Sequence, residues 1–445
     1  MKLLFVSAIV AAAAVTCVAD EIAVTVYNSN LGVISESRTL EFEKGVHEIA
    51  FRDVPTQIDA ASVRFYVDGG QVAILEQNYA YDLVSSDQLY AKYVDQDIEL
   101  IDKSGRLYSG TLLAYGSGNV TLLEPAGRVK IVLLENIAEV NFPSLPDGLI
   151  TRPTLFWRYQ AQSGGAKDCR VGYQTGGLNW KAEYVGVLDG KETELDLSGW
   201  SSITNNSGKT YTDATLKLVA GEISRAQPEP RFRADKFMTA SAPEAAGFEE
   251  KAFFEYHLYT LPRRATVANK ENKQISLFEP AHTGVDKVYT YRPDRDPKSV
   301  EVGLRLVNST ADGLGMPLPA GRVRLFKADD DGSMILLGED NLDHTPRDEE
   351  IRLKVGNAFD IVGEETVVDQ SRISQQVEER SFKTEIRNRK TEDITVKIEK
   401  KLYGYWQLMR SDFEYTKKDA NTIEFNLPVA AGLTATVNYT VRFGG

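Results

Sequence analysis

The feature that most constrains this chain is a two-residue alternation of apolar and polar side chains that recurs along its length. Every second residue from Val300 to Leu306 is apolar, and the stretch from Thr434 to Phe443 repeats the pattern. Side chains of a β-strand alternate between the two faces of a sheet, so each stretch predicts a strand with one buried face. Helical periodicity is confined to Ser86–Tyr93, where Ser86 is the expected N-cap. The chain is therefore predicted to be an all-β protein.

Residues 20–145 predict an N-terminal β domain whose second half is a small SH3-like barrel. Eight strands are expected in it, at Ile22–Tyr27, Arg38–Phe42, Val46–Phe51, Asp97–Ile101, Leu107–Ala114, Asn119–Leu123, Arg128–Leu133 and Glu139–Phe142. The last five are joined by short connections rich in glycine, which favour hairpins. A closed barrel removes the exposed edges of such a sheet, and this is the reason for expecting one.

Two further units, residues 154–362 and 375–445, are predicted to be tandem β-sandwich-like domains. The central unit is interrupted at residues 227–247 by a segment that combines three prolines with Ala, Ser and Glu. Such a composition does not bury enough apolar surface to cover a core, so we expect a flexible, exposed loop there.

The first 19 residues have the pattern of a secretory signal peptide. Lys2 precedes an apolar run that ends at Val15, and the small residues Cys17 and Ala19 stand before the expected cleavage site. The mature protein is predicted to begin at Asp20 and to be periplasmic or extracellular. The residues before Cys17 depart from a lipoprotein signal, so lipid anchoring at Cys17 is not expected. No later apolar stretch is long enough to span a bilayer as a helix.

The net charge restricts the classes of binding partner, and the cysteine content bears on disulfides. The formal net charge is −13 at pH 7, and nucleic acid is an unsuitable partner because phosphate binding needs a basic face. An envelope protein or a glycan is the expected partner, and the oligomeric state is left open.

The expected mature chain keeps one cysteine, Cys169, so it has no intramolecular disulfide. We expect Cys169 to be a strand thiol, with a reactive thiol as the alternative.

A short pattern recurs in which a strand ends in Asn before a turn. It occurs at Asn205, Asn308 and Asn388. An asparagine side chain can bond its own backbone two residues on, which suits the entry to a turn. The recurrence indicates either an internal duplication or a strand-to-turn pattern that is general in antiparallel β proteins.

Several segments resemble a known family. They are YQTGGLNWKAEY at 173–184, GW at 199–200, NNSGK at 205–209, LGMPLPAG at 314–321 and EQNYAYD at 76–82. In them the chain resembles the bacterial secreted β-rich proteins of unknown function that include the mucoidy-inhibitor-A-like group. The resemblance extends over most of the mature chain and implies a β-rich fold in the envelope or outside the cell. It implies no reaction, substrate or catalytic residue. Read from its own residues, the first segment alternates so that Trp180 and Tyr184 point into a core, with ligand stacking as the alternative.

No catalytic signature stands out in the sequence. There is no nucleophile elbow, zinc-protease motif, phosphate loop or dinucleotide fingerprint. The four histidines, His47, His257, His282 and His344, are too far apart in sequence to form a local metal pair. The acidic run Asp329–Ser333 contains Asp-Gly between two expected strands and predicts a hairpin turn rather than a calcium loop. No catalytic residue, metal ligand or cofactor is therefore predicted.

The candidate ligand-binding residues are Tyr403 and Tyr405. The alternation from Lys400 to Leu408 predicts a strand with Trp406 on its buried face and the two tyrosines on the other. Exposed aromatic rows stack on sugars or anchor protein partners, and packing against neighbouring strands is the alternative.

The favoured function is a secreted or periplasmic binding or scaffolding protein of unknown ligand. One alternative is an envelope carbohydrate- or peptide-active hydrolase, because enzymes that use paired carboxylates often lack a sequence signature. The other is a structural or assembly factor of the cell envelope.

Overall fold

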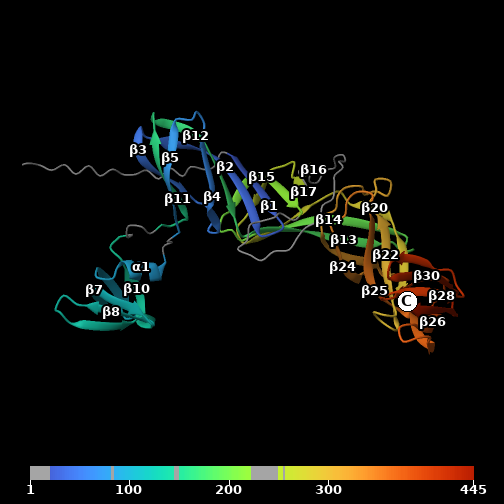
Figure 1. Cartoon of the computed structure of the whole chain (residues 1–445). Helices are drawn as coiled ribbons and strands as arrows, with labels where there is room; N and C mark the ends of the chain where they lie inside the picture. The colour runs from blue at the N-terminus through green and yellow to red at the C-terminus, as the bar shows by residue number, and fades with distance from the viewer. Residues whose placement is uncertain (1–20, 82–84, 145–149, 222–248, 254–255, 445) are drawn as a thin grey trace, which may run out of the picture. The chain divides into compact units, whose positions relative to one another are not determined.

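The computed structural model of this chain consists mostly of β-strands (Figure 1). It describes residues 21–81, 85–144, 150–221, 249–253 and 256–444. The strands β1 to β31 form five sheets, which confirms the prediction of an all-β protein. The predicted signal peptide with Cys17 and the predicted loop at 227–247 lie outside the described residues. None of the described helices is long and apolar enough to cross a membrane.

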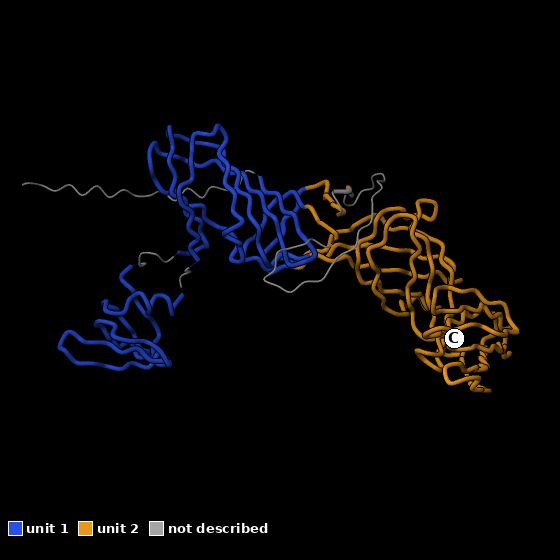
Figure 2. The backbone as a smooth tube through the Cα atoms, viewed as in Figure 1, with its two compact units in different colours: residues 1–179, 204–216, 264–271 blue, residues 180–203, 217–263, 272–445 orange. Residues whose placement is uncertain are grey.

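Two compact units make up the protein, and each is assembled from separate pieces of sequence (Figure 2). The first contains residues up to Asn179 together with Thr204–Leu216 and Arg264–Glu271. The second contains Trp180–Ile203, Lys217–Arg263 and the residues from Asn272 onward. Neither unit is therefore encoded by one continuous stretch.

The first unit contains a large sheet and a small sheet that share an aromatic core. The large sheet has the order β15-β1-β2-β12-β4, and β18 also pairs with β15. Its strands are β1 (Glu21–Tyr27), β2 (Leu31–Phe42), β4 (Ile58–Val67), β12 (Gly165–Thr175), β15 (Tyr211–Ala220) and β18 (Ala265–Val267). The small sheet has the order β3-β11-β5, with β3 (Gly45–Arg52), β5 (Val72–Ala80) and β11 (Thr154–Ala161). The ring of Phe65 on β4 lies 4.4 Å from Trp157 on β11, and Phe42 on β2 lies 4.9 Å from Tyr159 on β11. The two sheets therefore face each other across these rings.

A five-stranded sheet, also in the first unit, contains the strands that were predicted for the barrel. Its order is β10-β6-β7-β8-β9, formed by β6 (Asp97–Asp102), β7 (Leu107–Gly116), β8 (Asn119–Leu123), β9 (Val129–Leu133) and β10 (Ile137–Asn141). The five predicted strands are confirmed, but within the described part of the chain no pairing joins β9 to β10, so the predicted closed barrel is not found. A groove of about 470 Å³ lies there instead, lined by residues of β9 such as Lys130 and by Ile137 of β10.

A short helix, α1 (Ser86–Lys92), precedes this sheet and contributes to its core. The side chain of Ser85 accepts a hydrogen bond from the backbone N–H of Gln88, so the N-cap is Ser85 and not the predicted Ser86. Tyr90 of the helix and Tyr93 just after it are buried against Phe142 and the strands. The 3₁₀ helix η1 (Leu134–Asn136) joins β9 to β10.

The second unit begins with a six-stranded sheet of order β19-β14-β13-β23-β24, with β20 also paired to β14. Its strands are β13 (Leu178–Leu188), β14 (Glu194–Asn205), β19 (Glu271–Ser276), β20 (Ala281–Gly284), β23 (Gly321–Ala328) and β24 (Met334–Leu342). The strands β16 (Glu249–Phe253) and β17 (Tyr256–Thr260) pair with each other, and β17 pairs with residues 217–220 of β15. The turn between β23 and β24 contains the acidic run, and Gly332 has the positive φ of 83° that a hairpin turn needs. The predicted hairpin is therefore confirmed.

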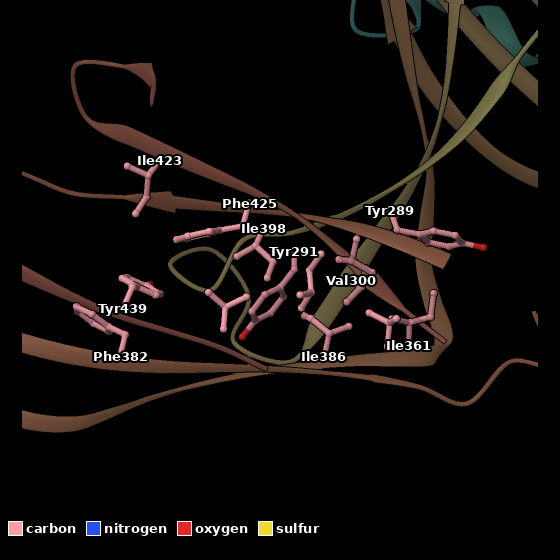
Figure 3. Close-up of a cluster of buried hydrophobic side chains, with 14 of the residues drawn as sticks. Tyr289, Tyr291, Val300, Ile361, Phe382, Ile386, Ile398, Ile423, Phe425 and Tyr439 are labelled. Carbon is pink, nitrogen blue, oxygen red and sulfur yellow. The ribbon is translucent and has the colours of Figure 1, made fainter. Parts of the chain in front are cut away.

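A nine-stranded sheet forms the rest of the second unit. Its order is β28-β31-β26-β25-β22-β21-β27-β30-β29, and the strands are β21 (Asp286–Tyr291), β22 (Ser299–Val307), β25 (Glu350–Arg372), β26 (Glu378–Asn388), β27 (Ile394–Lys401), β28 (Trp406–Ser411), β29 (Thr416–Asp419), β30 (Thr422–Val429) and β31 (Thr434–Phe443). Tyr439 of β31 stacks on Phe382 of β26 at 5.1 Å and lies 5.2 Å from Phe425 of β30, near the opposite end of the sheet (Figure 3). The sheet therefore curls until strands near its two ends share one core. The same sheet contains β21 and β22, which precede the predicted domain boundary at residues 362–375, and β25, which crosses the start of that boundary. It joins these strands to the C-terminal ones.

Candidate functional site

The two predicted ligand-binding tyrosines lie in the connection between β27 and β28. The predicted continuous strand over Lys400–Leu408 is wrong, because β27 ends at Lys401 and β28 begins at Trp406. Gly404 between the tyrosines has a φ of 78°, a value that breaks a strand and that glycine adopts without strain. Tyr403 and Tyr405 are 70% and 69% exposed, so both rings are available to a ligand.

Four contacts fix this connection, which we call the tyrosine loop (residues 402–405). Leu402 is buried, and its N–H donates to the carbonyl of Asn421 at 2.7 Å. The carbonyl of Tyr405 accepts from the N–H of Gly444 at 2.9 Å. The indole of the adjacent Trp406 donates to the carbonyl of Ala420 at 3.0 Å, and the ammonium of Lys417 lies 4.8 Å above the indole ring. The loop is thus held on one side by the turn between β29 and β30 and on the other by Gly444, the residue that follows β31.

The chemistry of the tyrosine loop suits stacking. A phenol ring offers an apolar face with a polar rim, and its two side-chain torsions cost little entropy to fix. The partly buried Trp406 packs against the C-terminal core and gives the loop a rigid base. A ligand with flat apolar faces and hydroxyl groups, such as a sugar, or an aromatic side chain of a protein, matches this surface.

The most deeply buried charges lie elsewhere, around Glu36 of β2. Glu36 is fully buried and accepts hydrogen bonds from Lys209 at 2.6 Å, from Arg38 at 2.5 Å and from the hydroxyl of Tyr173. Burial alone would raise the pKa of Glu36, but the charges of Lys209 and Arg38 outweigh it and lower the pKa. Burial raises the pKa of Tyr173 well above its usual range. Glu36 is therefore an anion enclosed by donors.

This cluster has the features of a structural element rather than of a catalytic centre. The side chain of Lys209 is 4% exposed, too little for a substrate to reach its amine. The Nη1 of Arg38 donates to the carbonyl of Arg52 at 3.0 Å, and the guanidinium stacks over Phe51 at 3.9 Å. The cluster was not predicted from the sequence, although Glu36 and Arg38, polar residues at inward positions of an alternating strand, are a signal for it.

The recurring asparagines share their burial and donate to backbone carbonyls in the same way. Asn205, Asn308 and Asn388 are fully buried, and each amide donates to carbonyls of the following turn and of a neighbouring segment. The side-chain oxygens of Asn205 and Asn388 accept from the backbone N–H two residues on, at Ser207 and Lys390, as predicted for a turn entry. The prediction is wrong for Asn308, whose oxygen accepts from the N–H of Gly315. Each asparagine thus pins a turn to the strand that precedes it.

The segments that carry the family resemblance come together inside the units. In the first unit, Lys209 and Tyr173, from two of these segments, meet at Glu36. In the second, the hydroxyl of Tyr184 donates to the carbonyl of Pro319 at 2.7 Å. Trp180 and Tyr184 are buried, which confirms the prediction of core packing.

The remaining candidates for chemistry do not form a reactive centre. Burial and the charge of Asp168 raise the pKa of the buried Cys169 thiol to about 12, so the prediction of a strand thiol is confirmed and the reactive alternative is disfavoured. His282 is exposed between Asp196 at 2.6 Å and Glu194 at 3.2 Å, and these carboxylates raise its pKa. In the part of the chain that the structure describes, no three His, Cys, Asp or Glu side chains gather as a metal site.

Comparisons with known proteins add no family. No protein-family model matches the chain, and no curated protein matches it either.

Proposed function

We propose that the chain is exported to the periplasm or beyond and that it binds or scaffolds envelope components through the tyrosine loop. The observation that carries this proposal is the exposure of Tyr403 and Tyr405 on a loop that backbone hydrogen bonds hold at both ends. A preformed aromatic surface loses little entropy on binding, so it suits recognition. The signal-like N-terminus and the net charge of −13 support an exported protein that does not bind nucleic acid.

The architecture supports a role in presenting the tyrosine loop to a binding partner. In this proposal, the facing sheets of the first unit and the curled sheet of the second are tandem β-sandwich-like supports. The resemblance to the mucoidy-inhibitor-A-like proteins favours the same location, and it adds no substrate.

Binding is a better proposal than hydrolysis because the perturbed carboxylates are already occupied. Glu36 is enclosed by Lys209 and Arg38, and Glu192 is bound by Lys287 and Lys327. A hydrolase acting through two carboxyls needs one of them protonated and both facing the substrate. These carboxylates instead have lowered pKa values and cationic partners.

The test is the double variant Tyr403→Ala/Tyr405→Ala in the full mature chain. Its binding to a panel of soluble bacterial envelope glycans and to detergent-free envelope protein extracts is compared with that of the unchanged protein. We expect the binding free energy of any captured probe to weaken by about 1–3 kcal/mol, the usual cost of removing an aromatic anchor. Far-UV circular dichroism and the melting temperature should be unchanged, because both rings are exposed.

Tyr66→Ala is the matched control, since Tyr66 is 57% exposed on β4 of the other unit. A probe that loses as much affinity in this control binds tyrosines without specificity for the loop. Turnover of a glycan or peptide that disappears on replacing a single carboxylate would support the hydrolase alternative and overturn the proposal.

A further inference from the structure

Strand β9, at the edge of the small five-stranded sheet, exposes a row of apolar side chains. Val129, Ile131 and Leu133 are 62%, 66% and 47% exposed, while Val132 among them is buried. In the described part of the chain, β9 is the last strand of its sheet and pairs with β8 alone. Single exposed apolar residues are common on protein surfaces, but an apolar row on an open sheet edge is a template for strand pairing.

The same three residues direct their backbone polar groups away from the sheet. The N–H of Glu124 donates to the carbonyl of Arg128 at 2.9 Å, which fixes the phase of the β8–β9 ladder. The pairing continues along β9 without a bulge. Because hydrogen-bonded pairs alternate in an antiparallel ladder, Lys130 and Val132 bond to β8. The N–H and C=O groups of the three apolar residues therefore point to the free edge.

We infer that β9 pairs antiparallel with β9 of a second copy of this chain, about a two-fold axis at Ile131. In this register Ile131 faces Ile131 of the second copy, and Val129 faces Leu133 of the second copy. All three are hydrogen-bonded positions, so the pairing forms about six backbone hydrogen bonds and joins the two apolar rows. The edge is complementary to itself because its apolar row is symmetric about its central residue.

The charges near β9 do not oppose a second copy as the occupant, whose edge matches this one in hydrogen-bond phase and in its apolar row. In this register Arg128 of each copy lies opposite Leu134 of the other, one residue from Glu135, and within its own copy Arg128 pairs with Glu124 at 3.0 Å. Lys130, on the opposite face, lies 3.3 Å from Glu124 and 4.5 Å over the ring of Tyr108, so its charge is already compensated. A charged side chain that points toward the sheet interior often blocks pairing at an edge strand. Lys130 does not block it here, because its charge is compensated.

The contact is small, so the association is weak. Five residues per copy bury less than the roughly 1,600 Å² of a standard protein interface. We therefore expect a dimer in concentrated solution that dissociates on dilution. The inference is independent of the tyrosine loop, which belongs to the other unit.

Sedimentation velocity of the full mature chain tests the inference, from about 1 µM to about 1 mM, the range in which weak complexes form. We expect the unchanged protein to shift toward twice its monomer mass as the concentration rises. Ile131→Lys places like charges opposite each other at the axis and should lower the association constant by at least about tenfold. Leu107→Lys is the matched control, because Leu107 is 55% exposed on β7 of the same sheet, away from the edge. It should associate like the unchanged protein.

Disulfide trapping tests the register. Under mild oxidation Ile131→Cys should cross-link to itself, whereas Val129→Cys and Leu133→Cys should cross-link only when the two variants are mixed. Cys169 is 2% exposed and does not interfere. A protein that stays monomeric over the whole range would overturn the inference and leave the edge to a strand of another protein. Self-cross-linking of Leu133→Cys as efficient as that of Ile131→Cys would overturn the register, and equal loss in Leu107→Lys would indicate nonspecific apolar association.

Discussion

Glu36 shows how a single buried charge ties together distant parts of the first unit. Its partners come from its own strand, from β12 and from the turn before β15. The lysine that neutralises it is 173 residues away in the sequence. Forming a buried ion pair contributes little net stability, because both groups lose their water, but removing one partner leaves a buried charge without compensation.

Lys209→Met should therefore destabilise the protein by about 3–5 kcal/mol, measured by urea unfolding at pH 7. Lys383→Met is the matched control, since Lys383 pairs with Glu385 at 2.9 Å where both side chains are partly exposed, and its loss should cost less than about 1 kcal/mol. The double variant Glu36→Gln/Lys209→Met should recover part of the loss, because no uncompensated carboxylate remains. A loss in Lys209→Met no larger than in the control would show that solvent reaches the cluster.

At the scale of strands and turns, the buried asparagines supply the hydrogen-bond donors that backbone carbonyls would find in a longer β-ladder. A chain that leaves a strand exposes carbonyls that must find donors, and a buried amide offers two. The amide of Asn388 donates to the carbonyls of Glu392, Val429 and Ala430. Its oxygen accepts from the N–H of Lys390, so one side chain satisfies both the turn and the end of β30.

Asn388→Ala should lower the free energy of unfolding by about 2–4 kcal/mol, because it leaves buried carbonyls and an N–H without partners. The exposed Asn357→Ala on β25 is the control and should stay within about 0.5 kcal/mol of the unchanged protein. Hydrogen exchange should locate the loss at the turn after β26. Uniform loosening of the second unit would instead assign Asn388 a role in core packing.

At the scale of the whole molecule, acid should destabilise the protein below about pH 4.5. Hydrogen bonds from Lys287 and Lys327 lower the pKa of Glu192 from 4.5 to about 2. For Glu183, burial would raise the pKa, but the hydrogen bond from Lys181 and other cationic contacts lower it to about 2. A carboxyl whose pKa is lower in the folded state stabilises the fold above its unfolded value, and this contribution is lost as the pH falls through the folded value.

Urea unfolding at pH 7 and pH 2.5 measures this linkage. Glu192→Gln should cost about 1 kcal/mol at pH 7, since its cationic partners are partly solvated, and the difference should shrink toward zero at the lower pH. The exposed Glu99→Gln on β6 provides the comparison. An unchanged difference at the two pH values would mean that Glu192 contributes through packing and not through its charge.

Local sequence patterns predicted the strands of this molecule well. They did not predict how strands and loops are arranged relative to one another. Alternation and glycine turns located the five strands of the small sheet, and Asp-Gly located the hairpin at residues 329–333. Closure of that sheet depends on its curvature, which the strand pattern does not encode, and the expected barrel is open. The alternation at Tyr403 and Tyr405 continued across Gly404, whose positive φ ends the strand. Their exposure followed from the pattern, but their place on a loop did not.

The interleaving of the two units also decides the order in which they can be completed. A ribosome delivers Glu36 first and Lys209 173 residues later, and the first unit lacks its last piece until Glu271 has emerged. By then the second unit has two of its pieces but none of the nine-stranded sheet, whose strands begin at Asp286. The first unit has all of its residues only after Glu271, and the second only after β31, so neither can be cut out by a single pair of gene boundaries.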